Sequence, residues 1–129
     1  MTLAEIEKLR ALAEQAKLRD VAAYVSVSGD LEKIDHQIRT LGIERRNKGL
    51  VTANDFKSIA VWQRWAESEM TKLEHRRHHV ALKKEQRRHE AMRSSAKVRS
   101  LEMLSKKASK EAVLQNRKRA EQNGLPPDA

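Results

Sequence analysis

The chain has 129 residues, a net charge of +9, no cysteine, and only 3% aromatic against 35% charged residues. The absence of cysteine excludes disulfides and thiolate chemistry, and no stretch approaches the ~20 apolar residues that a membrane-spanning helix requires. A composition so poor in aromatic residues and rich in Ala, Leu, Glu, Lys and Arg is typical of a coiled coil or long helix. The apolar fraction of 39% suffices for a narrow helical seam, so we favour a coiled coil over a disordered chain.

The first predicted helix covers about residues 3–47. Thr2 and Glu5 match a capping box, in which each side chain accepts a hydrogen bond from the other residue's backbone N–H. We interpret residues 28–30 (Ser-Gly-Asp) as a kink or a stutter in the heptads rather than a domain boundary. The apolar residues that share one helical face are Leu31, Ile34, Ile38 and Leu41, preceded by a weaker stripe of Leu9, Leu12, Ala16 and Ala23.

The predicted turn lies at residues 47–55. Gly49 suits the left-handed position that follows a helix. Thr52 with Asp55, or Asn54 alone, is suited to cap a second helix. The turn therefore joins two helices that run in opposite directions.

The second predicted helix covers about residues 54–122. Alternate steps of three and four residues from Phe56 to Ala112 visit seventeen positions, of which eleven are apolar, and the exceptions cluster between Arg77 and Arg87. After this helix, Asn-Gly-Leu-Pro-Pro stops the helical pattern, and we expect residues 123–129 to form a disordered tail.

These elements predict an all-α fold, in which two long helices form an antiparallel coiled-coil hairpin and residues 1–122 make a single domain. Because each residue adds ~1.5 Å to a helix, the first helix covers only part of the longer second one. The second helix should then project past its partner as a single basic helix. Four apolar residues are expected to lack a partner within the chain for this reason: Val98, Leu101, Leu104 and Leu114.

The sequence contains no convincing catalytic or metal site. His75 and His79 lie four residues apart, a spacing that can hold zinc, but neither cysteine nor a suitable acidic ligand joins them. We favour a solvated basic face for these residues and for His78 and His89. Four scattered glycines cannot form a phosphate loop, and a two-helix hairpin offers no pocket for acid–base chemistry. We therefore expect neither an enzyme nor a bound cofactor or metal.

Two features point to partners instead. The segment Lys72–Arg119 holds sixteen Lys and Arg against five Asp and Glu, which favours an acidic protein surface, nucleic acid or anionic lipid. Near the predicted turn, Trp62 and Trp65 lie three residues apart. They pack locally at the bend or serve as exposed interface anchors, and the sequence leaves both alternatives open.

The layout of the chain resembles the FliJ/YscO family, soluble components of the flagellar and type III secretion export machinery. The resemblance rests on a near-neutral first helix, a turn near residue 50, and a longer second helix with a basic end. Trp62-Gln63-Arg64-Trp65, continued by Met70 and Leu73, is similar to the run that the family carries after the bend, and Lys97–Gln122 is similar to its C-terminal helix.

The resemblance implies a non-enzymatic stalk and chaperone escort of the flagellar type III export apparatus. It would be cytoplasmic, peripheral to the inner membrane, and a monomer when free. Its partners would be the export ATPase hexamer, the cytoplasmic domain of the export gate, and export chaperones, with no specific nucleic acid. The residues expected at the ATPase ring are Leu9, Leu12, Leu101, Leu104 and Val113. The residues expected at the gate are Phe56, Trp62, Trp65, Met70 and Leu73.

Three alternatives remain beside the export stalk. A generic coiled-coil adaptor ranks second. A nucleic-acid-binding protein that uses the Lys72–Arg119 face ranks third, and its affinity would fall steeply with salt. A homo-oligomeric coiled coil would instead use polar seam residues to set its register; these are Gln63, Arg77, Lys84 and Arg87.

Overall fold

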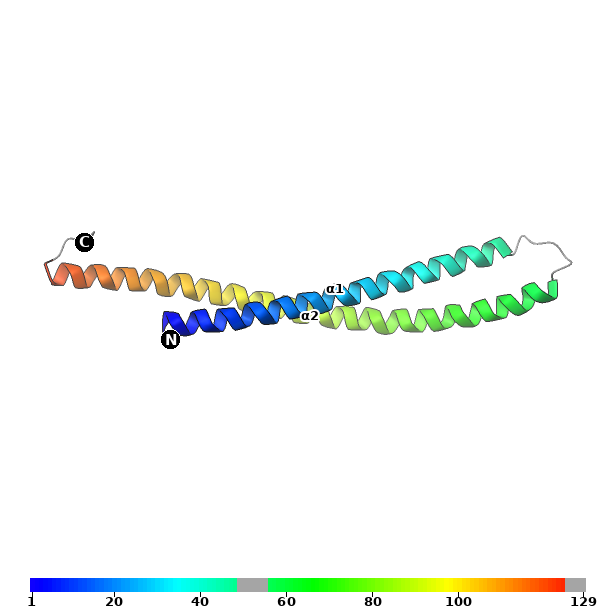
Figure 1. Ribbon diagram of the computed structural model, residues 1–129, viewed down its shortest axis with the longest axis horizontal. Coiled ribbons are helices and arrows are strands. Elements are labelled where there is room, and N and C mark those ends of the chain that lie inside the picture. Colours follow the sequence, from blue (N-terminus) through cyan, green and yellow to red (C-terminus); the bar gives the residue numbers. More distant parts are fainter. Residues whose placement is uncertain (49–55, 125–129) are drawn as a thin grey trace. The chain divides into compact units, whose positions relative to one another are not determined.

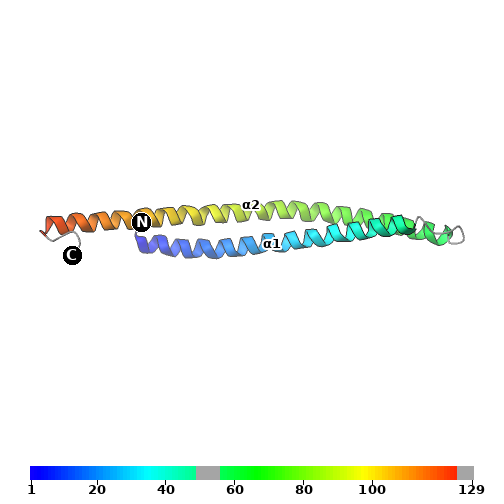
Figure 2. The same cartoon turned by 90° about the horizontal axis from the view of Figure 1, so that it is seen from above.

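The computed structural model describes residues 1–48 and 56–124, and these form two α-helices, α1 (Leu3–Lys48) and α2 (Phe56–Gln122), without a strand (Figures 1 and 2). The helices pack against each other as an antiparallel hairpin, and the second is the longer, as the sequence predicts. Both helices begin and end within two residues of the expected positions. The capping residues proposed in the turn, Gly49, Thr52, Asn54 and Asp55, lie outside the described residues.

The outer ends of the hairpin are explained by local hydrogen bonds. At the start of α1, the Glu5 backbone N–H donates to Thr2 Oγ1 over 3.2 Å and the Thr2 N–H donates to Glu5 Oε2 over 3.3 Å, which confirms the capping box. After α2, Gly124 adopts a φ of 72° and its N–H donates to the Glu121 carbonyl over 3.1 Å. This left-handed conformation favours glycine and ends the helix.

The buried side of α1 follows a strict seven-residue repeat. Ile6, Ala13, Val27, Ile34 and Leu41 are buried, and every interval between them is seven residues or twice seven. The repeat and the α-helix both continue unbroken through residues 28–30. The predicted stutter at this Ser-Gly-Asp sequence is therefore wrong, because a single glycine costs a helix only about 1 kcal/mol and the flanking apolar repeat offsets that cost.

The seam of α2 follows the predicted alternation of three and four residues. Ala66, Val98 and Ser105 are buried, whereas Gln63, Arg77 and Ala112 are exposed. The predicted seam residues that are half-buried are Ile59, Met70, Leu73, Val80, Lys84, Arg87, Ala91, Ser94, Leu101 and Ala108. The periodicity therefore identified the face of α2 that turns toward α1, although several of its residues are polar.

The contacts of the chain divide into two units. Unit 1 combines residues 1–20 with the part of α2 from Glu90 onward, and unit 2 combines residues 21–89 as far as they are described. Within unit 1, Glu7 lies opposite Ser105 and Arg10 lies opposite Glu102. Within unit 2, the contact between Asp35 and Arg77 shows the same antiparallel pairing. The boundary between the units thus lies away from residues 28–30.

Unit 1 ends in a part of α2 that has no α1 residue beside it (Figure 1). Because Glu7 is opposite Ser105 and α1 begins at Leu3, the first residues of α1 reach only to about Ala108 on α2. Val98 is buried and Leu101 is half-buried, so the expectation that they lack a partner in the chain is wrong. The expectation placed the start of α1 beside a part of α2 that is too close to the turn.

Candidate protein-interaction surfaces

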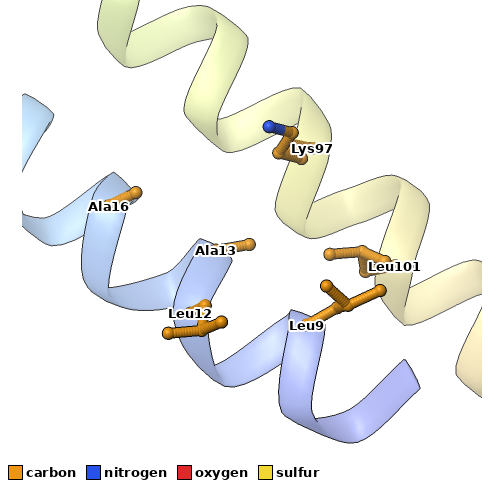
Figure 3. Close-up of a pocket in the computed structure, with 6 residues that line it drawn as sticks. All are labelled: Leu9, Leu12, Ala13, Ala16, Lys97 and Leu101. Carbon is orange, nitrogen blue, oxygen red and sulfur yellow. The ribbon is translucent and has the colours of Figure 1, made fainter. Parts of the chain in front are cut away.

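A groove of about 290 Å³ lies on the surface of unit 1 (Figure 3). Leu9 on α1 and Leu101 on α2 point toward each other across it. The residues that line the groove are Leu9, Leu12, Ala13, Ala16, Lys97 and Leu101. Lys97 is the one charged residue among them, so the surface is almost entirely apolar.

The groove runs along one edge of the α1–α2 seam. Each heptad of α1 has a second inward position four residues after the buried one, which half-buried Arg10 and Lys17 occupy. Leu9 and Ala16 directly precede these two residues, and Lys97 and Leu104 occupy the matching position of α2, directly before Val98 and Ser105. Leu9, Leu12 and Leu104 are exposed. We call these residues, together with Ala16 and Leu101, the leucine edge of unit 1. Single exposed apolar residues are common on proteins, whereas adjoining ones indicate a binding surface.

The opposite edge of unit 1 is polar and joined across the seam. Arg10 Nη2 lies 3.6 Å from Glu102 Oε1, and Arg10 Nε lies 3.3 Å from Glu14 Oε1. The Ser105 hydroxyl donates to Glu7 Oε1 over 2.5 Å. We call this the polar edge. Its carboxylates already have partners within the unit, so the two edges of the same helix pair differ in chemistry.

A further polar contact lies on the seam of unit 1. Asp20 occupies the place in the seven-residue repeat between Ala13 and Val27, and the Ser94 hydroxyl donates to its carboxylate. Asp20 also lies 3.5 Å from Arg19 Nε. Sequence reasoning missed this contact, because the apolar repeat gives no signal at a polar position. A polar seam residue with a specific partner favours one register of the helices over others.

Of the residues expected at the ATPase ring, three share the groove, namely Leu9, Leu12 and Leu101. Leu104 follows Leu101 on the leucine edge, and Val113 lies on α2 beyond the part that α1 covers. Both are exposed. All five belong to unit 1, although Leu9 and Leu12 lie on α1 and the other three lie on α2, about ninety residues further along the chain. Whether they contact an ATPase stays a prediction.

In unit 2, the two tryptophans differ in environment. Their ring centroids are 6.3 Å apart at an interplanar angle of 44°. Trp62 is half-buried, with Lys48 Nζ 4.5 Å from its ring centroid, which is a cation–π contact between α2 and the end of α1. Trp65 is exposed. Trp62 therefore packs locally, and Trp65 is the ring that remains available to a partner.

Trp65 borders a second groove, of about 410 Å³, within unit 2. Leu41 and Leu73 are the other apolar residues that line it, and the remaining lining residues are polar or charged: His36, Gln37, Thr40, Glu44, Glu69 and Arg76. Of the residues expected at the export gate, Trp65 and Leu73 line this groove, whereas Trp62 and Met70 do not. The side chain of Phe56 lies outside the described structure.

Charged side chains replace apolar ones over the middle of the unit 2 seam. Arg77 Nε lies 2.6 Å from Asp35 Oδ1, and Lys84 Nζ lies 6.0 Å from the Tyr24 ring centroid. These contacts account for the polar seam positions of the sequence pattern.

The Arg88 guanidinium donates to Glu85 over 2.5 Å and holds the pKa of that exposed carboxyl below its ordinary value.

The histidines on α2 are exposed and do not gather a metal-binding set. His78 and His79 have ring centroids 6.1 Å apart, and His89 Nε2 lies 3.2 Å from Glu85 Oε1. Within residues 1–48 and 56–124, no group of three or more metal-binding side chains comes together. Over the same residues, neither helix is long and apolar enough to cross a membrane.

Comparison of the chain with protein-family models, with curated proteins and with solved structures found no match.

Proposed function

We propose that this chain is a non-enzymatic stalk and chaperone-escort component of a flagellar type III export apparatus. The observation that supports the proposal most is the end of unit 1. There α2 continues past α1 as a single helix with exposed Val113 and Leu114. A helix that leaves apolar residues without a partner in its own chain is suited to bury them against another protein.

In the proposal, unit 1 contacts the export ATPase ring. Over residues 1–20 and 90–124, unit 1 carries thirteen Lys and Arg against eight Asp and Glu. A basic stalk within a ring of acidic groups would gain association rate and register from electrostatics more than it gains affinity. The exposed leucines of unit 1 would supply the buried contact.

Unit 2 is proposed to contact the cytoplasmic domain of the export gate, and to escort export chaperones. The exposed Trp65 beside Leu73 supports this assignment, because tryptophan is enriched among the residues that dominate binding energy at interfaces. The proposal places the chain in the cytoplasm, peripheral to the inner membrane, as a monomer when free. It assigns no catalytic role, cofactor or metal.

The test is a pull-down with the tagged full-length chain from flagellated bacterial extract, at physiological and at raised salt, with partners identified by mass spectrometry. Recovery of an export ATPase or an export-gate domain is the expected result. The double variant Leu104→Asp with Val113→Asp should lose the ATPase, because both side chains are exposed and their replacement leaves the α1–α2 seam intact.

The matched control is Leu18→Asp with Leu82→Asp, which places the same charges on two other exposed leucines. Equal helicity of both double variants by circular dichroism would separate a lost contact from a lost fold. Recovery of nucleic acid alone, released as salt rises, would refute the export proposal and favour a basic nucleic-acid-binding protein.

A further inference from the structure

One edge of unit 1 is apolar and the other is polar, and the packing of two helices does not by itself require this difference. A helix that packs against one partner needs apolar residues only at the two seam positions of each heptad. A third apolar position beside the seam is typical of a helix in a bundle, where a further helix covers it. Unit 1 has such residues on both of its helices: Leu9 and Ala16 on α1, and Leu104 on α2.

The same position is polar or charged in much of unit 2. On α1 the equivalent residues are Ala23, Asp30, Gln37 and Glu44, and on α2 they are Trp62, Glu69, Arg76 and Lys83. The leucine edge is therefore a local property of unit 1 and does not follow from the helix pairing itself. An unpaired helix face of this kind exposes apolar side chains to water, which is unfavourable unless another surface covers them.

The charges around the leucine edge indicate the chemistry of what covers it. Lys97 lies in the groove, Arg93 precedes it by one helical turn, and Lys107 follows Leu104 by three residues. On α1, Arg19 follows Leu12 by two turns and therefore lies on the same face. Basic side chains thus outnumber acidic ones beside the leucines. Glu5 lies on the same face seven residues before Leu12, but its carboxylate accepts the Thr2 N–H and caps α1. The carboxylates of the polar edge lie on the other side of the seam.

We propose that the leucine edge of unit 1 is the docking site for a third helix: an amphipathic helix of a partner protein, whose apolar stripe is flanked by carboxylates. Its apolar residues enter the groove between Leu9 and Leu101, and its carboxylates meet the basic residues on either side. From Leu9 to Ala16 the edge extends ~10 Å along α1, which corresponds to about two turns of the docked helix. The proposal concerns the kind of partner and stands whether or not the chain serves an export system.

A second copy of this chain is a poorer occupant than an acidic helix. The groove would then face a surface of the same positive charge, because unit 1 is basic as a whole. Like charges placed across an interface cost binding energy and suppress that partner. The carboxylates that could offset the repulsion, Glu7 and Glu102, are engaged within the polar edge.

The probe is a fluorescein-labelled synthetic helix about three heptads long, with Leu at the seam positions and Glu at the two flanking positions. Repulsion between the glutamates keeps this peptide from pairing with itself. Two control peptides carry Lys in place of Glu, or Ser in place of Leu. Binding to the full-length chain is measured by fluorescence anisotropy at physiological salt. The variant Leu12→Gln removes an exposed leucine of the groove without changing the charge of the protein.

The matched control is Leu82→Gln, because Leu82 is 58% exposed and Leu12 is 63% exposed, and both lie within long helices. We expect saturable binding of the acidic peptide, weakened about tenfold by Leu12→Gln, which removes the burial of one leucine, and unchanged by Leu82→Gln. The lysine and serine peptides should bind at least about tenfold more weakly than the acidic one.

Three results would overturn the inference. Equal effects of Leu12→Gln and Leu82→Gln would place the peptide elsewhere. Equal binding of the glutamate and lysine peptides would remove the argument from charge. A concentration-dependent dimer in sedimentation equilibrium that Leu12→Gln abolishes would identify a second copy of the chain as the occupant. Failure of the acidic peptide to bind would likewise overturn the inference, but it would leave the export proposal to its own test, because that test scores native partners.

Discussion

The strongest test of the α1 seam is a pair of isoleucine-to-alanine substitutions in one helix. Ile34 is 3% exposed and Ile43 is 49% exposed, and both belong to unit 2. Each substitution removes the same three methyl or methylene groups, and each gains the same few tenths of a kcal/mol of helix propensity. The two variants therefore differ only in what surrounds the side chain.

At about 0.8 kcal/mol for each buried methyl or methylene group, full burial of Ile34 contributes roughly 2.4 kcal/mol, to which the cavity left behind adds. We expect Ile34→Ala to lower the free energy of unfolding by about 2–3 kcal/mol. Ile43→Ala should lower it by less than about 1 kcal/mol, since half of that side chain already meets water and the gain in helix propensity offsets part of the loss.

The assay is urea unfolding followed by circular dichroism at the helical minimum, with the slope of free energy against urea compared between variants. An unchanged slope means that the substitution altered stability without altering the surface exposed on unfolding. If Ile43→Ala proved as costly as Ile34→Ala, or more so, the assignment of the buried face of α1 would be refuted.

Three further predictions concern α2 and its contacts. Ala66 is fully buried, so Ala66→Leu should overpack the seam and destabilise the hairpin by about 1–3 kcal/mol in the same urea assay. A double-mutant cycle on Arg77 and Asp35 should give a coupling of at most about 1 kcal/mol that shrinks as salt is raised, because the pair is partly exposed. The hydrogen bond from Arg88 lowers the pKa of Glu85 in the folded chain. Its contribution to stability is therefore present above the ordinary glutamate pKa and is lost as pH falls through the lowered value. An NMR titration should show the Glu85 pKa rising in Arg88→Gln, and an unchanged pKa would contradict the contact.

Much of the fold could be predicted because it is encoded locally. The capping box at Thr2 and Glu5 satisfies backbone groups within one helical turn, and no glycine or proline occurs between Phe56 and Gln122. The alternation of apolar residues then identified the inward face of α2 and of α1 from Leu31 to Leu41, since that face must repeat with the helical period. At the start of α1 the expected stripe was wrong, because Leu9 and Leu12 are exposed and Ile6 and Ala13 are buried instead. The interpretation of residues 28–30 as a stutter was wrong for the opposite reason: a local weakness was overridden by the apolar repeat on both sides of it.

The interaction surfaces were less accessible to sequence reasoning. Leu9 and Leu12 were expected at an interface through a family resemblance, but the sequence alone did not show that they share a groove with Leu101, ninety residues away along the chain. The two tryptophans could not be told apart until Lys48 was found over one ring and the other was found exposed. The extra apolar position beside the seam in unit 1 is visible in the sequence and could have indicated the leucine edge.

The sequence by itself determined that the chain forms two long helices, where each begins and ends, and which face turns inward along α2 and over the second half of α1. Helical hydrogen bonds join residues four apart, and helical faces repeat within a few residues, so short-range information suffices. The tertiary structure decided which α2 residue stands opposite each α1 residue, and hence that Val98 is buried whereas Leu104 and Val113 are exposed. A side chain is buried only where another surface covers it. The axial offset between the two helices therefore decides which of several similar apolar residues is covered.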